Sequence, residues 1–321
     1  MKKLITIVIS LLFSQCILAT DVDKIDFLIP GGEGGGWDTT ARQTGQALID
    51  SGLINSATYR NLSGSGGGRA LIDLIENEKK HENTLMVQST PLILRNITGV
   101  IKNDYRDVRP VALMIAEFQV LVVPASSPFK NTADFVAAIE KSALNNPILG
   151  GSSKGSLDHI TAALILKSAG LDSLKMRYIP SDGGGDALKR LYEGEGSGDA
   201  ISLVTGYGEI VDDFHAGKLR ILGISSENRL PGIDAPTFKE QGYKVVFANW
   251  RGFFARPTIS DKQFSAYEKM LNNLHKTAIW ADIRAKYGWA DFYKSGEDLM
   301  QFLTSQEADI KETLQTLGII K

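Results

Sequence analysis

The chain has 321 residues, of which 35 are basic and 37 acidic, and it contains a single cysteine. A mildly acidic chain without basic clusters is not expected to bind nucleic acid, and its four scattered histidines show no metal-ligand spacing, so we expect neither a metal nor a cofactor. A length of about 300 residues exceeds one ordinary hydrophobic core and suggests two domains.

The N-terminus is typical of a secretory signal peptide. Two lysines precede an apolar run that is too short for a membrane span, and Ala19 provides the small residue before a cleavage point. We therefore predict a signal peptide over residues 1–19. Its loss leaves 33 basic and 37 acidic residues, a net charge near −4, and no cysteine. A lipid anchor on Cys16 is the weaker alternative, because Gln15 stands where a lipoprotein signal has a very small residue.

Short apolar segments alternate with helical patterns along most of the mature chain. The predicted strands are, in order, KIDFLI, ATYRNL, NTLMVQ, PILGG, KMRYIP, AISLVT and LRILGIS. Helical patterns lie between them, such as TTARQTGQALIDSG, which Gly52 ends. This alternation predicts a parallel or mixed α/β sheet.

A loop rich in Gly, Ser or Thr follows nearly every predicted strand. The loops are PGGEGGGWD, SGSGGG, STP, GGSSKGS, SDGGG and TGYG. In an open α/β sheet, ligands bind beyond the carboxyl ends of the strands, where such loops lead into helix N-termini with free N–H groups. Glycine there lets an anion approach the backbone closely. The repetition favours a small polyanion held by amides and hydroxyls over a series of unrelated turns.

Four side chains around the first loop need separate interpretation. Asp38 is most simply the cap of the first helix, and Arg42 more often pairs with a local carboxylate than with a ligand. Trp37, directly after a glycine run, is interpreted as the wall of a pocket rather than part of a core. Glu33 opposes an anion site unless it points to solvent or a cation is bound as well.

Two sequence motifs would indicate other functions, namely nucleotide binding and ester hydrolysis. The glycine loops do not give the spacing of a dinucleotide fingerprint or a P-loop. Residues 151–155 do match Gly-x-Ser-x-Gly, the nucleophile elbow of a hydrolase, with Ser153 as the nucleophile. His159 lies on the helix that this loop opens, so we expect it to pack or cap there.

Two long apolar segments interrupt the alternation, at residues 111–124 and 243–257. If the middle of the chain forms a separate lobe, these are the places where the chain crosses over and returns. We therefore predict one lobe from residues 20–121 and 247–321, and a second from residues 122–246. The region from Asp261 to Ile320 is predicted to be helical and to pack on the first lobe.

Six segments resemble successive signature segments of the Bug-type receptors, the extracytoplasmic solute-binding proteins of tripartite tricarboxylate transporters. They are IPGGEGGGWDTTAR, NLSGSGGGRALIDLI, GGSSKGSLDHITAAL, YIPSDGGGDAL, HAGKLRILGISSENRLPGIDAPTFKEQGY and NWRGFFARP. The resemblance covers essentially the whole mature chain, and the GGGWD form of the first loop resembles the tricarboxylate-binding branch. Glu33 departs from the pattern, because related sequences often have proline or a small residue there.

The resemblance implies a two-lobed α/β fold of the type II periplasmic-binding-protein kind, with two hinge-crossing strands and a carboxylate enclosed between the lobes. In the first lobe, the residues it implies for ligand contact are Gly34, Gly35, Gly36, Trp37, Asp38, Gly66, Gly67, Ser89 and Thr90. In the second lobe they are Ser152, Ser153, Ser156, Gly206 and Tyr207.

The function implied is that of a periplasmic receptor, not an enzyme. It would capture citrate or a related di- or tricarboxylate, close by hinge motion, and deliver the ligand to the membrane subunits of a tripartite transporter. We expect a monomer. Two alternatives stay open: a secreted serine hydrolase that uses Ser153, and a carboxylate-sensing accessory protein for a two-component system.

Overall fold

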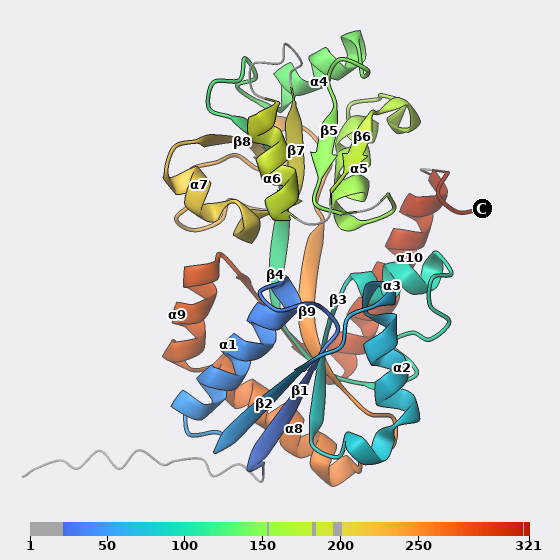
Figure 1. The fold of residues 1–321 in the computed structure, drawn as a ribbon, viewed down its shortest axis with the longest axis vertical. Helices are drawn as coiled ribbons and strands as arrows, with labels where there is room; N and C mark the ends of the chain where they lie inside the picture. The colour runs from blue at the N-terminus through green and yellow to red at the C-terminus, as the bar shows by residue number, and fades with distance from the viewer. Residues whose placement is uncertain (1–21, 153, 182–183, 195–200, 317) are drawn as a thin grey trace, which may run out of the picture.

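The computed structural model describes residues 22–152, 154–181, 184–194, 201–316 and 318–321 (Figure 1). The predicted signal peptide and Ser153 lie outside the described residues. The rest forms two α/β lobes, one above the other in Figure 1, with two strands running between them. No helix in the described part of the chain is long and apolar enough to cross a membrane.

The lower lobe in Figure 1 combines both ends of the chain. Its N-terminal elements are β1 (Lys24–Ile29), α1 (Gly36–Asp50), β2 (Ser56–Asn61), α2 (Gly68–Glu76), β3 (Thr84–Ser89) and α3 (Pro91–Ile97). Its C-terminal elements are α8 (Asp261–His275), α9 (Ala278–Tyr287), β10 (Ala290–Ser295) and α10 (Gly296–Thr316). The three parallel strands begin and end within about two residues of the segments predicted for them.

The upper lobe is built from the middle of the chain. Its elements are α4 (Thr132–Lys141), β5 (Ile148–Gly150), α5 (Leu157–Ser168), β6 (Tyr178–Pro180), α6 (Gly184–Glu193), β7 (Ser202–Gly206), α7 (Val211–His215) and β8 (Leu219–Ile224). Strands β6, β5 and β7 are parallel, as the alternating pattern predicts. Helix α4 is not among the predicted elements, although Asn131 caps it by accepting a hydrogen bond from the backbone N–H of Asp134.

Strands β4 (Arg109–Pro124) and β9 (Ala248–Ala255) join the lobes. The sheet order is β2-β1-β3-β9-β4-β7-β5-β6, with β8 and β10 also paired to β4. Strand β4 pairs with β9 as far as Phe118 and with β7 and β8 from Gln119 onward, so one strand belongs to the sheets of both lobes. The two long apolar segments of the sequence therefore form the crossings.

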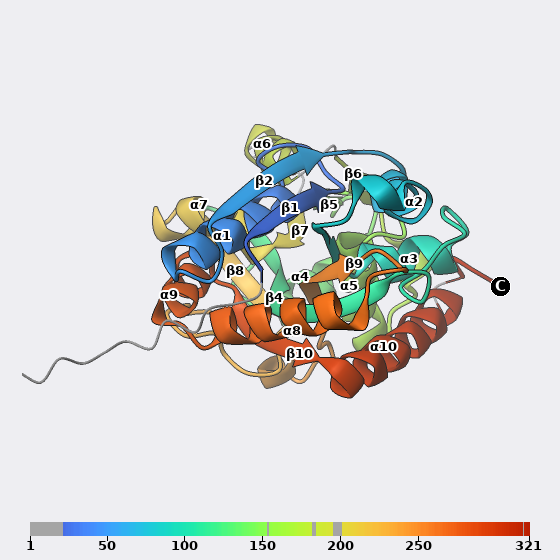
Figure 2. The same ribbon diagram turned by 90° about the horizontal axis from the view of Figure 1, so that it is seen from below.

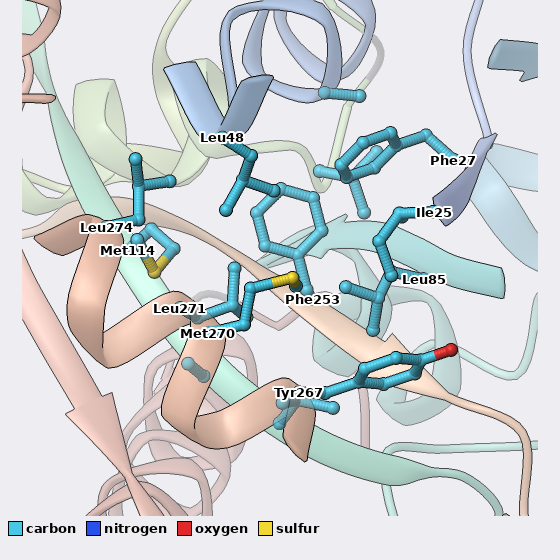
Figure 3. Packing of buried hydrophobic residues seen from close by; sticks show 14 of the residues in the cluster. Ile25, Phe27, Leu48, Leu85, Met114, Phe253, Tyr267, Met270, Leu271 and Leu274 are labelled. Atoms are coloured by element: carbon cyan, nitrogen blue, oxygen red, sulfur yellow. The ribbon is translucent and has the colours of Figure 1, made fainter. Parts of the chain in front are cut away.

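One core cluster of the lower lobe lies between its sheet and helices α1 and α8 (Figure 3), and a second includes buried residues of α2, α3 and α10. Phe27 from β1 and Phe253 from β9 meet edge to face, with ring centroids 5.5 Å apart. Leu48 from α1 and Met270 from α8 are fully buried in the same cluster. Figure 2 shows α8 and α10 running along the underside of this lobe, and residues of both helices are buried in its core clusters.

The prediction that the C-terminal region is entirely helical is wrong at β10. This strand pairs antiparallel with β4, between α9 and α10. Gly288 and Gly296 flank it, with φ of 62° and 56°, a backbone conformation that glycine adopts without strain. Gly288 is the residue at which α9 ends, and Gly296 is the residue at which α10 begins. The segment between them therefore belongs to neither helix and forms a short strand.

Candidate functional site

A cavity of about 180 Å³ lies between the lobes, beside the crossing strands. Strands β4 and β9, the start of α3, the loop from β5 into α5, and the end of β7 all contribute to its wall. Drug-sized pockets are typically about 300–1,000 Å³, so this volume suits a small organic ligand. A cavity of about 450 Å³ lies in the lower lobe, and one of about 500 Å³ lies between α5 of the upper lobe and α10 of the lower lobe. Among the described residues, the strand-end loops of the upper lobe line the 180 Å³ cavity and neither of these two.

The floor of the cavity is one polar face of the two crossing strands. Glu117 and Gln119 are two residues apart on β4, and Asn249 and Arg251 are two residues apart on β9. Side chains two apart on a strand share a face, and Glu117 pairs directly with Asn249 in the ladder. All four are buried and line the cavity.

A buried ion pair holds this floor together. Arg251 Nη2 lies 2.5 Å from Glu117 Oε2, and the Gly208 N–H donates a 3.1 Å hydrogen bond to Glu117 Oε1. A Cβ atom added at Gly36 would lie 2.3 Å from the Arg251 guanidinium. The first loop therefore adjoins the cavity through Arg251, and glycine at position 36 leaves the space that the guanidinium occupies.

The loop from β5 into α5 forms the upper wall. Ser152 Oγ lies 2.7 Å from Asp158 Oδ2 and 2.6 Å from Ser156 Oγ. Burial raises the pKa of Asp158 to about 7; the hydrogen bond from Ser152 opposes this shift, and the negative charges of Glu209 and Glu117 add to it. This carboxyl group therefore changes charge near neutral pH.

Glu209, just after β7, contributes a third carboxyl group to the cavity. Thr205 Oγ1 donates a hydrogen bond to it, and a Cβ atom added at Gly184 would collide with it, so it lies against the start of α6. Surrounding protein raises the pKa of Glu209, and the charge of Glu117 adds to this effect. The charge of Glu117 therefore opposes ionisation of both Asp158 and Glu209.

Arg95, on α3, is the second cation of the cavity. Within the described part of the chain it has no carboxylate partner, unlike Arg251. A Cβ atom added at Gly66 would lie 2.5 Å from Arg95 Nε, so the SGSGGG loop packs directly on this side chain. An unpaired guanidinium in a cavity is well suited to receive a carboxylate.

The first-loop residues predicted to contact ligand lie beside the cavity rather than in its wall. Gly34, Gly35 and Gly36 are exposed, and Asp38 is buried. The helix cap predicted at Asp38 is wrong, because the cap position is Gly35 and Asp38 lies in the first turn, where it accepts a hydrogen bond from the Gly34 N–H.

Asp38 also pairs with Arg42 at 2.9 Å and accepts a hydrogen bond from Asn61, so the predicted local pairing of Arg42 is confirmed. Glu33 is exposed on the first loop.

Trp37 joins three loops of the lower lobe. Its Nε1 donates a 2.9 Å hydrogen bond to Ser89 Oγ, and its ring lies 3.0 Å from the Cβ position of Gly31 and 3.3 Å from that of Gly67. Thr90 is fully buried, and its hydroxyl lies 3.4 Å from the Ala248 carbonyl oxygen. These contacts are structural, and a role of these residues toward a ligand stays a prediction.

In the upper lobe, three of the predicted residues line the cavity: Ser152, Ser156 and Gly206. Tyr207 is buried, and a Cβ atom added at Gly288 of the lower lobe would lie 2.6 Å from its ring, so Tyr207 packs across the two lobes. Ser153 is outside the described residues.

His159 acts as a local structural group, as expected. Its Nδ1 accepts a 3.0 Å hydrogen bond from the Gly155 N–H, and its ring packs on Tyr178 with centroids 4.6 Å apart. Burial lowers the pKa of His159 to about 4, with a further contribution from the charge of Lys154. At neutral pH the ring is therefore uncharged and its Nδ1 is an acceptor for the loop.

Sequence analysis missed the polar residues of the crossing strands. Its expectation of an anion held mainly by amides did not include Arg95, Glu117, Gln119, Asn249 or Arg251. The sequence does contain a pattern that indicates the four residues on β4 and β9. Each strand has two polar residues, two positions apart, within an otherwise apolar segment, and such a pattern indicates a buried polar face with a function.

Comparison with known proteins gives a consistent result. Residues 83–319 match the model of the "Tripartite tricarboxylate transporter family receptor". A curated relative from Pseudomonas sp. strain P51, named "UPF0065 protein in tcbD-tcbE intergenic region", is 27% identical over 241 residues, which cover 72% of this chain and 67% of the relative.

Solved structures share the fold. A TctC solute-binding protein from Polaromonas, without ligand, has a TM-score of 0.72 at 22% identity, covering 92% of this chain and 98% of its own. An R. palustris protein with adipate has a TM-score of 0.77 at 19% identity, covering 93% and 98%. MatC from Rhodopseudomonas palustris, with bound malate, has a TM-score of 0.67 at 19% identity, covering 92% and 98%.

Proposed function

Because the chain belongs to the tripartite tricarboxylate transporter family of receptors, we propose that it captures a small di- or tricarboxylate of the citrate type between its lobes and delivers it to the membrane subunits of such a transporter. Members of this family are solute-binding receptors rather than enzymes, and they act outside the cytoplasm. The signal peptide proposed over residues 1–19 agrees with that location.

The proposal rests on two features that face each other across one cavity. One is a cation without a carboxylate partner among the described residues, and the other is the start of a helix. Arg95 lies on the lower-lobe side, and Ser156 is the N-cap residue of α5 on the upper-lobe side. The first N–H groups of a helix have no partner within it and attract anions, and the hydroxyls of Ser152 and Ser156 stand beside them. A ligand with two carboxylates would meet a donor set on each lobe.

The predicted loop residues are proposed to complete the site when a ligand is present. Gly36 lies next to Arg251 and Gly66 lies next to Arg95, so both glycine loops of the lower lobe reach the cavity through an arginine, and Gly34 and Gly35 belong to the first of these loops. We propose lobe boundaries at 121/122 and 246/247, near the point where β4 changes its pairing partners.

Calorimetric titration of the purified mature protein with citrate, tricarballylate, succinate and an aromatic carboxylate tests the proposal. Saturation at 100 times the dissociation constant should stabilise the protein by about 2.7 kcal/mol, which a melting curve detects. Arg95→Gln should weaken binding about 10- to 100-fold, the loss of a charge-assisted hydrogen bond. Lys175→Gln, which changes an exposed upper-lobe cation, is the matched control.

No response to any carboxylate would reject the proposal, as would equal affinities for wild type and Arg95→Gln. Delivery is tested separately, by uptake of the bound acid into cells that express the membrane subunits with and without this receptor. Light scattering after size exclusion tests the expected monomer.

A further inference from the structure

A buried carboxyl group lies within the proposed carboxylate site. Asp158 is the second residue of α5, is 7% exposed, and lines the cavity between the lobes. The N–H groups at the start of this helix are the proposed donors to a ligand carboxylate, so an ionised Asp158 would repel the ligand that they attract. The site therefore attracts an anion most strongly when Asp158 is neutral.

Two serine hydroxyls connect Asp158 to the cavity. Ser152 Oγ lies 2.7 Å from Asp158 Oδ2 and 2.6 Å from Ser156 Oγ, and both serines line the cavity. Each hydroxyl carries one hydrogen, and an ionised carboxylate only accepts hydrogen bonds. When Asp158 is ionised, Ser152 donates its hydrogen to the carboxylate and Ser156 donates to Ser152. Neither hydrogen is then available to a ligand.

Protonation of Asp158 reverses the direction of these hydrogen bonds. The neutral carboxyl group donates its hydrogen to Ser152 Oγ, Ser152 donates to Ser156 Oγ, and the Ser156 hydrogen becomes free for a ligand carboxylate. The oxygen atoms need not move, because only the hydrogens change position. One proton therefore removes a negative charge from the site and adds a donor to it.

The charged groups of the cavity determine how readily Asp158 takes this proton. Burial, with the negative charges of Glu209 and Glu117, raises the pKa of Asp158 to about 7. Arg251, on β9, is paired with Glu117, and Arg95, on α3, is the other cation of the cavity. A bound dicarboxylate adds negative charge beside Asp158 and so favours its neutral form further.

The remaining titratable groups near Asp158 come from β6, α5 and the loop before α5. Tyr178 donates a 2.7 Å hydrogen bond to a carbonyl oxygen of this loop, and burial raises its pKa, so it stays neutral. Burial lowers the pKa of His159 to about 4, and Lys154 is exposed. Asp158 is hydrogen-bonded to a cavity serine, whereas Glu209 is hydrogen-bonded to a threonine of β7. Asp158 is therefore the group whose proton would act on the serines.

We propose that Asp158 is a positioning residue for the bound carboxylate. Ligand binding takes up one proton from the solvent onto this carboxyl group, and the proton turns the hydroxyl hydrogens of Ser152 and Ser156 from Asp158 toward the ligand. This inference rests on the proposed carboxylate-binding function, and it adds that capture of the ligand is linked to pH.

Calorimetric titration in two buffers counts the protons taken up. Succinate, tricarballylate and citrate are each titrated at pH 8 in phosphate and in Tris. The enthalpies of ionisation of these buffers differ, so the difference in measured enthalpy gives the number of protons bound. A group with a pKa of about 7 is roughly nine-tenths ionised at pH 8, so we expect each acid that binds to take up about 0.5–0.9 proton. An uptake below about half a proton would overturn the inference.

Variants assign the proton to a residue. Asp158→Asn has an amide that donates to Ser152 as the neutral acid does but cannot ionise. Its proton uptake should fall by more than half, and its affinity should lose the decline, up to about tenfold per pH unit, that we expect of wild type between pH 7.5 and 9. Asp212→Asn, which changes an exposed carboxylate on α7, is the matched control and should behave as wild type. Asp158→Asn with more than half of the wild-type uptake would overturn the inference.

An infrared measurement covers the case in which Asp158→Asn does not fold. Ligand addition to wild type at pH 8 should produce the carbonyl band of a neutral carboxyl group, and this band should persist in Glu209→Gln. Absence of the band in wild type, or its loss in Glu209→Gln, would contradict the assignment to Asp158.

The outcomes separate this inference from the proposed function. If none of the three acids binds, the proposed function fails and this inference fails with it. If an acid binds without proton uptake, the proposed function stands and this inference is rejected.

Discussion

The buried pair between Arg251 and Glu117 gives the sharpest stability prediction. Their side chains belong to the two crossing strands, are 8% and 6% exposed as residues, and approach to 2.5 Å. Replacing Arg251 by methionine keeps most of the side-chain volume but leaves Glu117 buried without its cation. Breaking a buried pair in this way costs about 3–5 kcal/mol, because an uncompensated charge stays behind.

For a chain of this size, each kcal/mol lowers the melting temperature by roughly 2 °C, so Arg251→Met should melt about 6–10 °C below wild type. Urea denaturation followed by circular dichroism gives the free energy directly. In the double variant Arg251→Met with Glu117→Gln, no unpaired charge remains, so at least half of the lost stability should return. A loss below about 1 kcal/mol in the single variant, or no recovery in the double variant, would refute this reasoning.

Four further predictions follow from individual contacts. Trp37→Phe removes the hydrogen bond to Ser89 and should cost about 1 kcal/mol in urea denaturation; an unchanged free energy of unfolding would contradict this. Gly36→Ala places a Cβ atom 2.3 Å from the Arg251 guanidinium and should cost about 1–3 kcal/mol and weaken ligand binding; unchanged melting would show that the loop can move aside. Burial alone would raise the pKa of Asp38, but hydrogen bonds from Arg42, the Gly34 N–H and Asn61 outweigh it and lower this pKa. The stabilisation is therefore present above a pH of about 4 and lost below it, so the difference between wild type and Asp38→Asn should shrink as the pH falls from 6 to 3. The pKa of Asp158 is raised to about 7, so its contribution to stability falls as the pH rises from about 4 to about 7, and Asp158→Asn should flatten that decline in pH-dependent melting curves.

The fold could be predicted from the sequence because its signals are local. Each predicted strand is a short apolar segment closed by a glycine- or serine-rich loop, and this punctuation determines where one element stops. The crossing at β4 could also be recognised, because β4 is a 16-residue apolar strand and the other strands in the described part of the chain have at most eight residues. By contrast, β10 has mostly half-buried side chains, and its strand conformation depends on pairing with β4, a partner more than 150 residues away.

The candidate site could be predicted only in part, since its residues carry different kinds of signal. Ser152, Ser156 and Gly206 lie at strand ends, where the position in the fold already indicates a ligand. Arg95 lies one turn inside a helix, and nothing in its neighbourhood distinguishes it from a solvated arginine until α3 is seen to face the upper lobe.

The crossing strands give the cavity of about 180 Å³ a rigid polar floor, whereas loops and a helix start form its upper wall. Loops and helix starts present N–H groups that fit any carboxylate. The donors at the start of α5 would therefore not distinguish one carboxylate ligand from another. Side chains on β4 and β9 are fixed by the ladder between them, and Glu117 is fixed further by Arg251 and the Gly208 N–H. Because β4 pairs in the sheets of both lobes, this rigid floor lies at the place where the two lobes meet, and the loops above it belong to the upper lobe.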